Sequence, residues 1–86
     1  MAKYTMCSVL DLTAQQYGRP FFAVSDGSAI RGFSDEINHP DNNSILYKHP
    51  DDFQLFRIGT FDDSSGKVDL CDPVMLISGA SVAVRG

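Results

Sequence analysis

The sequence predicts an α+β fold, in which a mainly antiparallel four-stranded sheet carries one helix on one of its faces. Segments of alternating side chains lie toward both ends of the chain, an amphipathic segment with helical spacing lies between them, and glycine- and proline-containing turns separate these segments. The predicted order is β-β-α-β-β. We expect residues 1–73 to form a single domain and residues 74–86 to form a C-terminal tail, as either a short helix or an extended arm.

The first two strands are predicted from alternation and from a proline. In residues 3–12 (KYTMCSVLDL), Tyr4 and Met6 point to one face and Thr5 and Cys7 to the other. Residues 13–18 are polar and end in glycine, which indicates a loop. Residues 20–24 (PFFAV) follow as a second strand, because proline suits a strand start or an edge strand.

The helix is predicted from its cap, its spacing and its stop signal. Ser25 or Asp26 is a suitable N-cap, since a short acceptor side chain can bind a free N–H of the first turn. His39-Pro40 ends the helix, because proline disfavours helical backbone at the residue before it. Apolar residues lie between these limits at helical spacing: Ala29, Ile30, Phe33 and Ile37.

A strand hairpin is predicted in the second half of the chain. Residues 49–52 (HPDD) indicate a turn or a single helical turn, and residues 53–61 (FQLFRIGTF) form the best strand segment. Residues 62–66 (DDSSG) are a turn, from which residues 67–71 return as the partner strand. We expect Asp72-Pro73 to end that strand.

This arrangement leaves one face of the sheet without a covering layer. Neighbouring residues of a strand point to opposite faces, so the pairs Phe21-Phe22 and Leu55-Phe56 make both faces apolar. Only one helix is predicted to cover them. Because an 86-residue chain also has a thin core, we expect a homodimer or a higher oligomer.

The sequence resembles a known viral family in several short motifs that occur in a fixed order. They are Pro20-Phe21, Ala29-Ile30-Arg31-Gly32-Phe33, Pro50-Asp51-Asp52-Phe53-Gln54-Leu55, Gly59-Thr60-Phe61-Asp62-Asp63 and Gly66. With the opening YTMCSVLDL, this set resembles the small non-structural protein of gokushoviruses, the tailless icosahedral single-stranded DNA phages of the Microviridae. The tail departs most from the family pattern.

The resemblance implies a replication role rather than a structural one. The family protein is absent from the virion, and a phage accessory of this kind acts in the host bacterial cytoplasm. It is thought to bind DNA, or to help switch genome synthesis from double-stranded intermediates to single-stranded progeny.

The sequence indicates neither catalysis nor a bound cofactor. An enzyme would need a nucleophile with a base, paired acids or a metal shell. Cys7 and Cys71 are far apart and lack metal-ligand spacing, so both are interpreted as small core hydrophobes. His39 and His49 each precede a proline and are interpreted as turn residues. We predict a non-enzymatic protein with no metal site, and no membrane span, since no apolar run approaches about 20 residues.

Candidate nucleic-acid-binding residues combine positive charge with aromatic rings. Single-stranded DNA is held by phosphate pairing and by stacking of bases on rings. The net charge of −4 opposes such binding, so a binding surface would have to be local. The alternative is that the rings belong to the core and that the arginines pair with carboxylates of the protein. For Arg57, such a carboxylate would lie across a dimer interface. The candidates are Arg19, Phe22, Arg31, Tyr47, Lys48 and Arg57.

Two functions are consistent with these features. The first is a single-stranded-DNA-binding replication accessory. The second is a protein–protein interaction module that engages a host or phage replication protein without direct DNA contact, as the acidic balance and the uncovered apolar face suggest.

Overall fold

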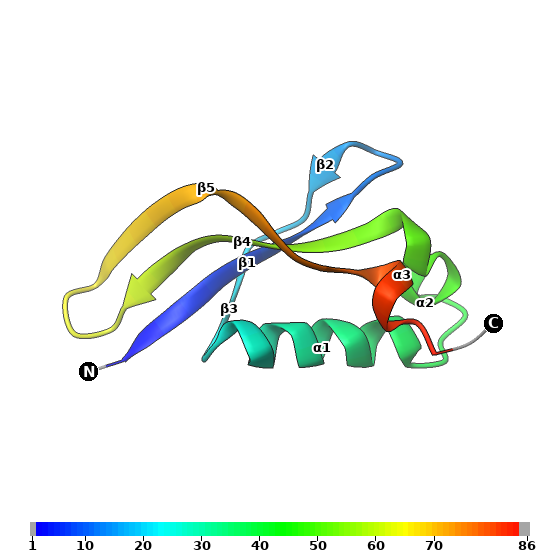
Figure 1. The fold of residues 1–86 in the computed structure, drawn as a ribbon, viewed down its shortest axis with the longest axis horizontal. Coiled ribbons are helices and arrows are strands. Elements are labelled where there is room, and N and C mark those ends of the chain that lie inside the picture. The colour runs from blue at the N-terminus through cyan, green and yellow to red at the C-terminus, as the bar shows by residue number, and fades with distance from the viewer. Residues whose placement is uncertain (1, 85–86) are drawn as a thin grey trace.

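The computed structural model describes residues 2–84, in which a long, curved antiparallel sheet lies over one main helix (Figure 1). The predicted α+β class is confirmed. The strands are β1 (Lys3–Asp11), β2 (Gln16–Tyr17), β3 (Phe21–Ala23), β4 (Phe53–Asp62) and β5 (Lys67–Ser78). The helices are α1 (Asp26–Asn38), α2 (Ile45–Lys48) and α3 (Gly79–Val82), with a 3₁₀ turn η1 (Pro50–Asp52).

Strand β1 lies inside the sheet, between β4 and the two short strands. The order is β2-β1-β4-β5, and β3 pairs with β1 beside β2, on the edge that β4 leaves free. Strand β2 is an addition to the four predicted strands, because residues 13–18 were expected to be a loop. Its pairing of Leu10 with Tyr17 is made possible by a tight turn in which Gln15 adopts a φ of 56°.

Helix α1 forms where the sequence predicts it. Ser25 is the N-cap, and its hydroxyl accepts a hydrogen bond from the Ser28 N–H at 3.0 Å. The helix ends at Asn38, two residues before Pro40. Its buried residues Ala29, Phe33 and Ile37 recur every four positions, so they form one stripe that faces the sheet.

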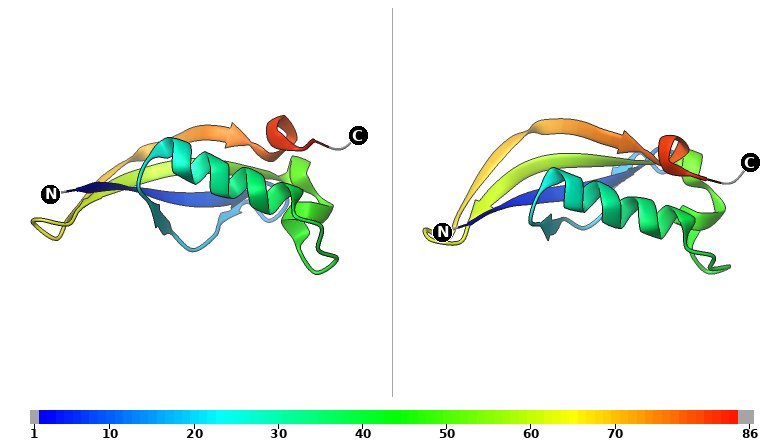
Figure 2. Two further views of the ribbon diagram at one scale, coloured as in Figure 1. Left: turned by 90° about the horizontal axis from the view of Figure 1, so that it is seen from below. Right: turned by 60° about the horizontal axis from the view of Figure 1, so that its bottom comes forward.

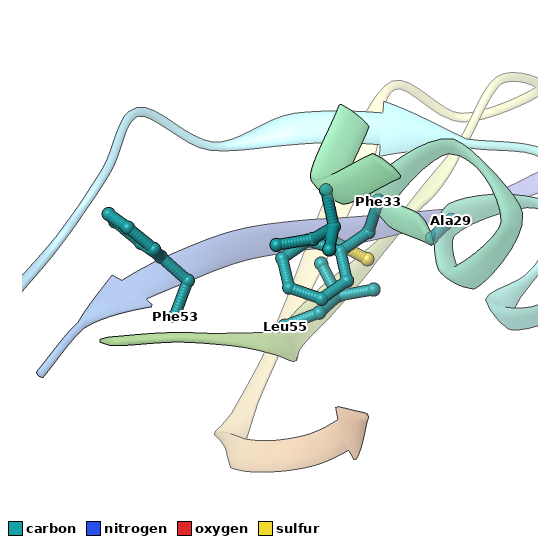
Figure 3. Packing of buried hydrophobic residues seen from close by; sticks show 6 residues of the cluster. Ala29, Phe33, Phe53 and Leu55 are labelled. Atoms are coloured by element: carbon teal, nitrogen blue, oxygen red, sulfur yellow. The ribbon is translucent and has the colours of Figure 1, made fainter. Parts of the chain in front are cut away.

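The core lies between this stripe and the face of the sheet that α1 covers. Phe33 of α1 and Leu55 of β4 meet in its centre (Figure 3). Cys7, Ile37 and Leu55 are fully buried. The buried cluster is Cys7, Ala29, Phe33, Ile37, Phe53 and Leu55.

The predicted end of the last strand is wrong, and most of the predicted tail belongs to the fold. Strand β5 continues through Pro73 to Ser78. Proline is tolerated there because residues 71–73 have no partner in the β4 ladder and no strand pairs with the outer side of β5 within the described residues. The Asn38 side chain then holds the end of the chain by donating to the Val82 carbonyl at 2.9 Å and accepting from the Val84 N–H at 3.0 Å. Residues 85 and 86 of the predicted tail lie outside the described residues.

Two glycines provide a matched test of how closely α3 packs. A Cβ at Gly79 would collide with the Pro50 carbonyl oxygen and lie 3.0 Å from Ile37 Cδ1, whereas a Cβ at Gly32 meets nothing within 4 Å. We expect Gly79→Ala to lower the free energy of unfolding by about 1–3 kcal/mol. Gly32→Ala should raise it by up to about 1 kcal/mol, because alanine favours helix. Urea titrations followed by circular dichroism measure both, and equal effects would contradict the close packing of α3.

Candidate nucleic-acid interface

The face of the sheet opposite α1, here called the open face, is apolar and aromatic. Cross-strand partners share a face, so the registers Tyr4–Phe61, Met6–Phe22 and Ser8–Phe56 place these side chains together. They point away from α1, because Cys7 and Leu55 in the same strands are buried beneath it. The open face comprises Tyr4, Met6, Ser8, Leu10, Tyr17, Phe22, Gln54, Phe56, Gly59, Phe61, Val68, Leu70 and Met75.

A bulge in β4 brings Phe61 to this face. Met6 pairs with Gly59 and Cys7 pairs with Arg57, so β4 carries an extra residue between them. The extra residue reverses the alternation, which leaves Leu55 and Arg57 on the α1 side and turns Gly59 and Phe61 to the open face. Simple alternation along β4 would have placed Phe61 with Leu55.

The rings of the open face form two groups. Tyr4 stacks on Phe61 with centroids 6.3 Å apart, and Phe22 approaches Phe61 edge-on at 5.8 Å. At the other end of the face, Tyr17 meets Phe56 edge-on at 5.5 Å. Phe22 is 54% exposed and Tyr17 is 47% exposed, so both groups present ring surface to solvent. Such rings can stack on planar ligands.

Charged side chains are segregated away from the open face. Lys3, Asp62 and Lys67 form one cross-strand row on the α1 side, and Asp69 pairs with Thr60 on that same side. Among the described residues that pair across the sheet, none on the open face carries a charge. In a chain with a net charge of −4, the paired rows of this surface therefore carry no carboxylate that would repel a polyanion.

Arg57 finds its anion within the same chain. Its guanidinium forms an ion pair with the carboxylate of Asp26 at the start of α1. Asp26 also accepts a hydrogen bond from the Thr5 hydroxyl at 3.2 Å. The pair thus fastens the first turn of α1 to β1 and β4, and Arg57 points to the α1 side rather than to the open face.

Removing this carboxylate should loosen the start of α1. Asp26→Ala should lower the free energy of unfolding by about 1–2 kcal/mol, because it removes the ion pair, the Thr5 hydrogen bond and a favourable charge in the first turn. Asp35→Ala, an exposed position on the same helix, is the matched control and should change it by less than about 0.5 kcal/mol. Urea titration measures both, and the loss from Asp26→Ala should shrink in high salt.

The other predicted site residues fall into two places. Arg19 is exposed in the connection between β2 and β3, two residues before Phe21, and Phe22 follows in β3 at the edge of the sheet. Arg31 is exposed on α1, whereas Tyr47 and Lys48 belong to α2, in the helical layer. Arg19 and Phe22 thus share one short edge segment of the chain, whereas Arg31, Tyr47 and Lys48 lie in helices and Arg57 lies on the α1 side.

Sequence reasoning missed four rings of the open face. Tyr4, Tyr17, Phe56 and Phe61 come from three different strands. Alternation in β1 does place Tyr4 and Met6 on one face, which is the one local signal available. Their pairing with rings of β4 depends on register and on the bulge, which local patterns do not reveal.

The two cysteines have opposite environments. Cys7 is fully buried, and desolvation together with the nearby Asp26 carboxylate raises the pKa of its thiol, while Arg57 lowers it. Cys71 is exposed on β5, so the expectation that it is a core residue is wrong. The first half of β5 lies beyond the start of α1, where no described element covers it (Figure 1).

This difference predicts selective thiol labelling. At pH 8 a disulfide-exchange reagent should modify Cys71 rapidly, because the thiol is accessible. Cys7 should react only after addition of denaturant, since the thiol is both inaccessible and held protonated by its raised pKa. The absorbance of the released leaving group measures how many thiols react in each phase. Two fast thiols in native protein would contradict the burial of Cys7. Cys71→Ser should remove the fast phase.

Two other kinds of feature, a metal-binding cluster and a membrane-spanning helix, are absent from residues 2–84. No group of three or more His, Cys, Asp or Glu side chains is placed to hold a metal ion. None of the helices in these residues has both the length and the apolar character that a membrane crossing requires.

Comparison with known proteins gives the family. The family model described as Phage ORF5 protein matches residues 4–82, which include the second half of β5 and α3. Protein ORF5 of Chlamydia phage 1 is 36% identical over 62 residues, a match that spans 70% of this chain and 65% of that relative. No solved structure matches the chain. The chain therefore belongs to the phage ORF5 protein family, which confirms the resemblance to the gokushovirus proteins of the Microviridae.

Proposed function

We propose that the protein binds single-stranded DNA through the open face and serves as a non-enzymatic accessory of phage genome replication. The main support is the combination of two solvent-exposed aromatic groups with the absence of charge from the paired residues of that face, within the described sheet. Family membership supports the phage setting, and the resemblance to gokushovirus proteins suggests the switch to single-stranded genome synthesis.

Base stacking would supply most of the affinity. Each base that stacks on an aromatic ring contributes about 1–3 kcal/mol, and this term tolerates any sequence because every base has a flat face. Tyr4, Phe22 and Phe61 form one platform, and Tyr17 with Phe56 forms a second. Because both lie on one side of one sheet, a single strand can cross both. Antiparallel sheets that carry exposed rings bind single-stranded nucleic acid in this way.

Cations at the edge and the end of the sheet would pair with phosphates that extend past the open face. Arg19 lies in the connection between β2 and β3, while Lys3 and Lys67 begin β1 and β5 on the α1 side. These strands begin where the sheet extends beyond the start of α1 (Figure 1). Three contacts give a slope of log affinity against log salt no steeper than about −2. Asp62 lies between the two lysines in the cross-strand row, so their contribution is reduced.

This proposal places the protein's action in the host bacterial cytoplasm, outside the virion. The homodimer or higher oligomer expected from the thin core is part of it, because a second copy would lengthen the aromatic surface. Light scattering on the samples used for DNA titration measures the oligomeric state.

Fluorescence anisotropy with labelled oligo-dT tests the binding surface. The double variant Phe56→Leu/Phe61→Leu keeps apolar volume but removes one ring from each platform, so affinity should fall about tenfold or more. Tyr47→Leu on α2 removes a ring from the helical layer and should change affinity less than about twofold.

Arg19→Gln should flatten the salt slope by about 0.7, whereas Arg31→Gln on the exposed side of α1 should leave it unchanged.

Several results would contradict the proposal. One is no binding at tens of micromolar protein in low salt, with circular dichroism showing folded protein. Another is an equal loss of affinity in the Tyr47→Leu control. Equal changes of slope in the two arginine variants would place the phosphate contacts elsewhere.

A further inference from the structure

A groove of about 630 Å³ lies between β3 and α1, and Tyr4 and Phe22 of the open face border it. Figure 2 shows β3 beside the helix at the edge of the sheet. Phe21 and Val24 come from the strand side, and Ala29, Gly32 and Phe33 come from the helix side. Phe21 is 38% exposed and Val24 is 68% exposed, so apolar surface along the groove faces solvent.

The helix side of the groove is kept open by small residues. Ser28 and Gly32 lie one turn apart in the lining, and the space where a Cβ of Gly32 would lie is empty to 4 Å. A methyl group at this position would enter the space of the groove without meeting another atom. Glycine lowers helix stability by about 1 kcal/mol relative to alanine, so the sequence keeps the groove open at a cost in stability.

The strand side offers backbone groups as well as side chains. Strand β3 pairs with β1 from Thr5–Ala23 to Cys7–Phe21, and within residues 2–84 no strand pairs with its opposite edge. That edge therefore presents a row of N–H and C=O groups at strand spacing. An extended polypeptide backbone carries matching groups at the same spacing, whereas nucleic acids and lipids do not.

The charge of the groove also selects its occupant. Glu36 is the one ionised side chain among its lining residues in the described chain. A carboxylate beside an apolar groove repels phosphates and fatty acid headgroups, but it can pair with a lysine or arginine. The groove thus differs from the open face, whose paired residues carry no charge.

We propose that this groove binds an extended, apolar segment of another protein, which adds as a strand to the free edge of β3 and places a basic side chain against Glu36. Alternate side chains of the segment would point toward Gly32 and Phe33. Peptide binding in this groove is a separate activity from DNA binding and does not depend on it. Tyr4 and Phe22 border both surfaces, but the other rings of the two surfaces differ.

The probe for this site is a displayed library of random decapeptides, selected against the full chain. We expect enriched peptides to have alternating apolar residues and one lysine or arginine. Synthetic copies should bind Gly32→Leu at least about tenfold more weakly, because the leucine occupies the groove. Arg31→Leu, the adjacent helix position outside the groove, should bind them unchanged. Glu36→Lys should weaken the binding of the same peptides. Replacement of their basic residue by glutamate should restore binding to this variant.

Amide exchange and chemical shifts locate the bound peptide. Protection of β3 amides and shifts in residues 28–36 support the proposal. Failure to enrich any peptide, equal binding to Gly32→Leu and wild type, or shifts confined to the open face would overturn it. Gly32→Leu should retain oligo-dT binding and Phe56→Leu/Phe61→Leu should retain peptide binding, so failure of one site is distinguishable from failure of the other. Circular dichroism of each variant confirms its fold.

Discussion

One amphipathic helix can bury only one face of a sheet, and this limit accounts for the main features of the molecule. Helix α1 covers the side on which Cys7 and Leu55 lie, and its own stripe is completed by Phe33 and Ile37. The C-terminal α3 packs beside α1 and η1, so it extends the helical layer (Figure 2). The opposite face, within the described residues, is left to aromatic side chains that cover one another only in part.

Charge follows the same division. Lysines and aspartates of the long strands lie mainly on the α1 side, where Asp26 neutralises Arg57 at the start of the helix. The open face keeps neutral side chains along its paired rows. On an acidic protein, such a face would repel a polyanion less than the carboxylate-bearing surfaces do, so that stacking, rather than a basic patch, determines where it binds.

The local features of this fold could be predicted, and the non-local ones could not. Alternation predicted β1 and β4, and the Ser25 cap with apolar spacing predicted α1, because each signal lies within a few residues. The end of β5 was misjudged because Pro73 breaks a strand only where its N–H is needed, and sequence does not show that β5 is an edge. For the candidate site, Arg19 and Phe22 are local neighbours, whereas the contact between Tyr4 and Phe61 depends on the bulge in β4.

The short strand β3 connects the two proposed surfaces. Phe22 touches Phe61 on the open face and also lines the groove beside α1. A peptide that paired with β3 would fix the backbone that carries this ring, and a base stacked on the ring would do the same from the other side. Two ligands that order the same element favour each other's binding by an equal factor. A three-residue strand with one described partner strand makes few ladder hydrogen bonds, so this coupling would be centred on β3 rather than on the long strands.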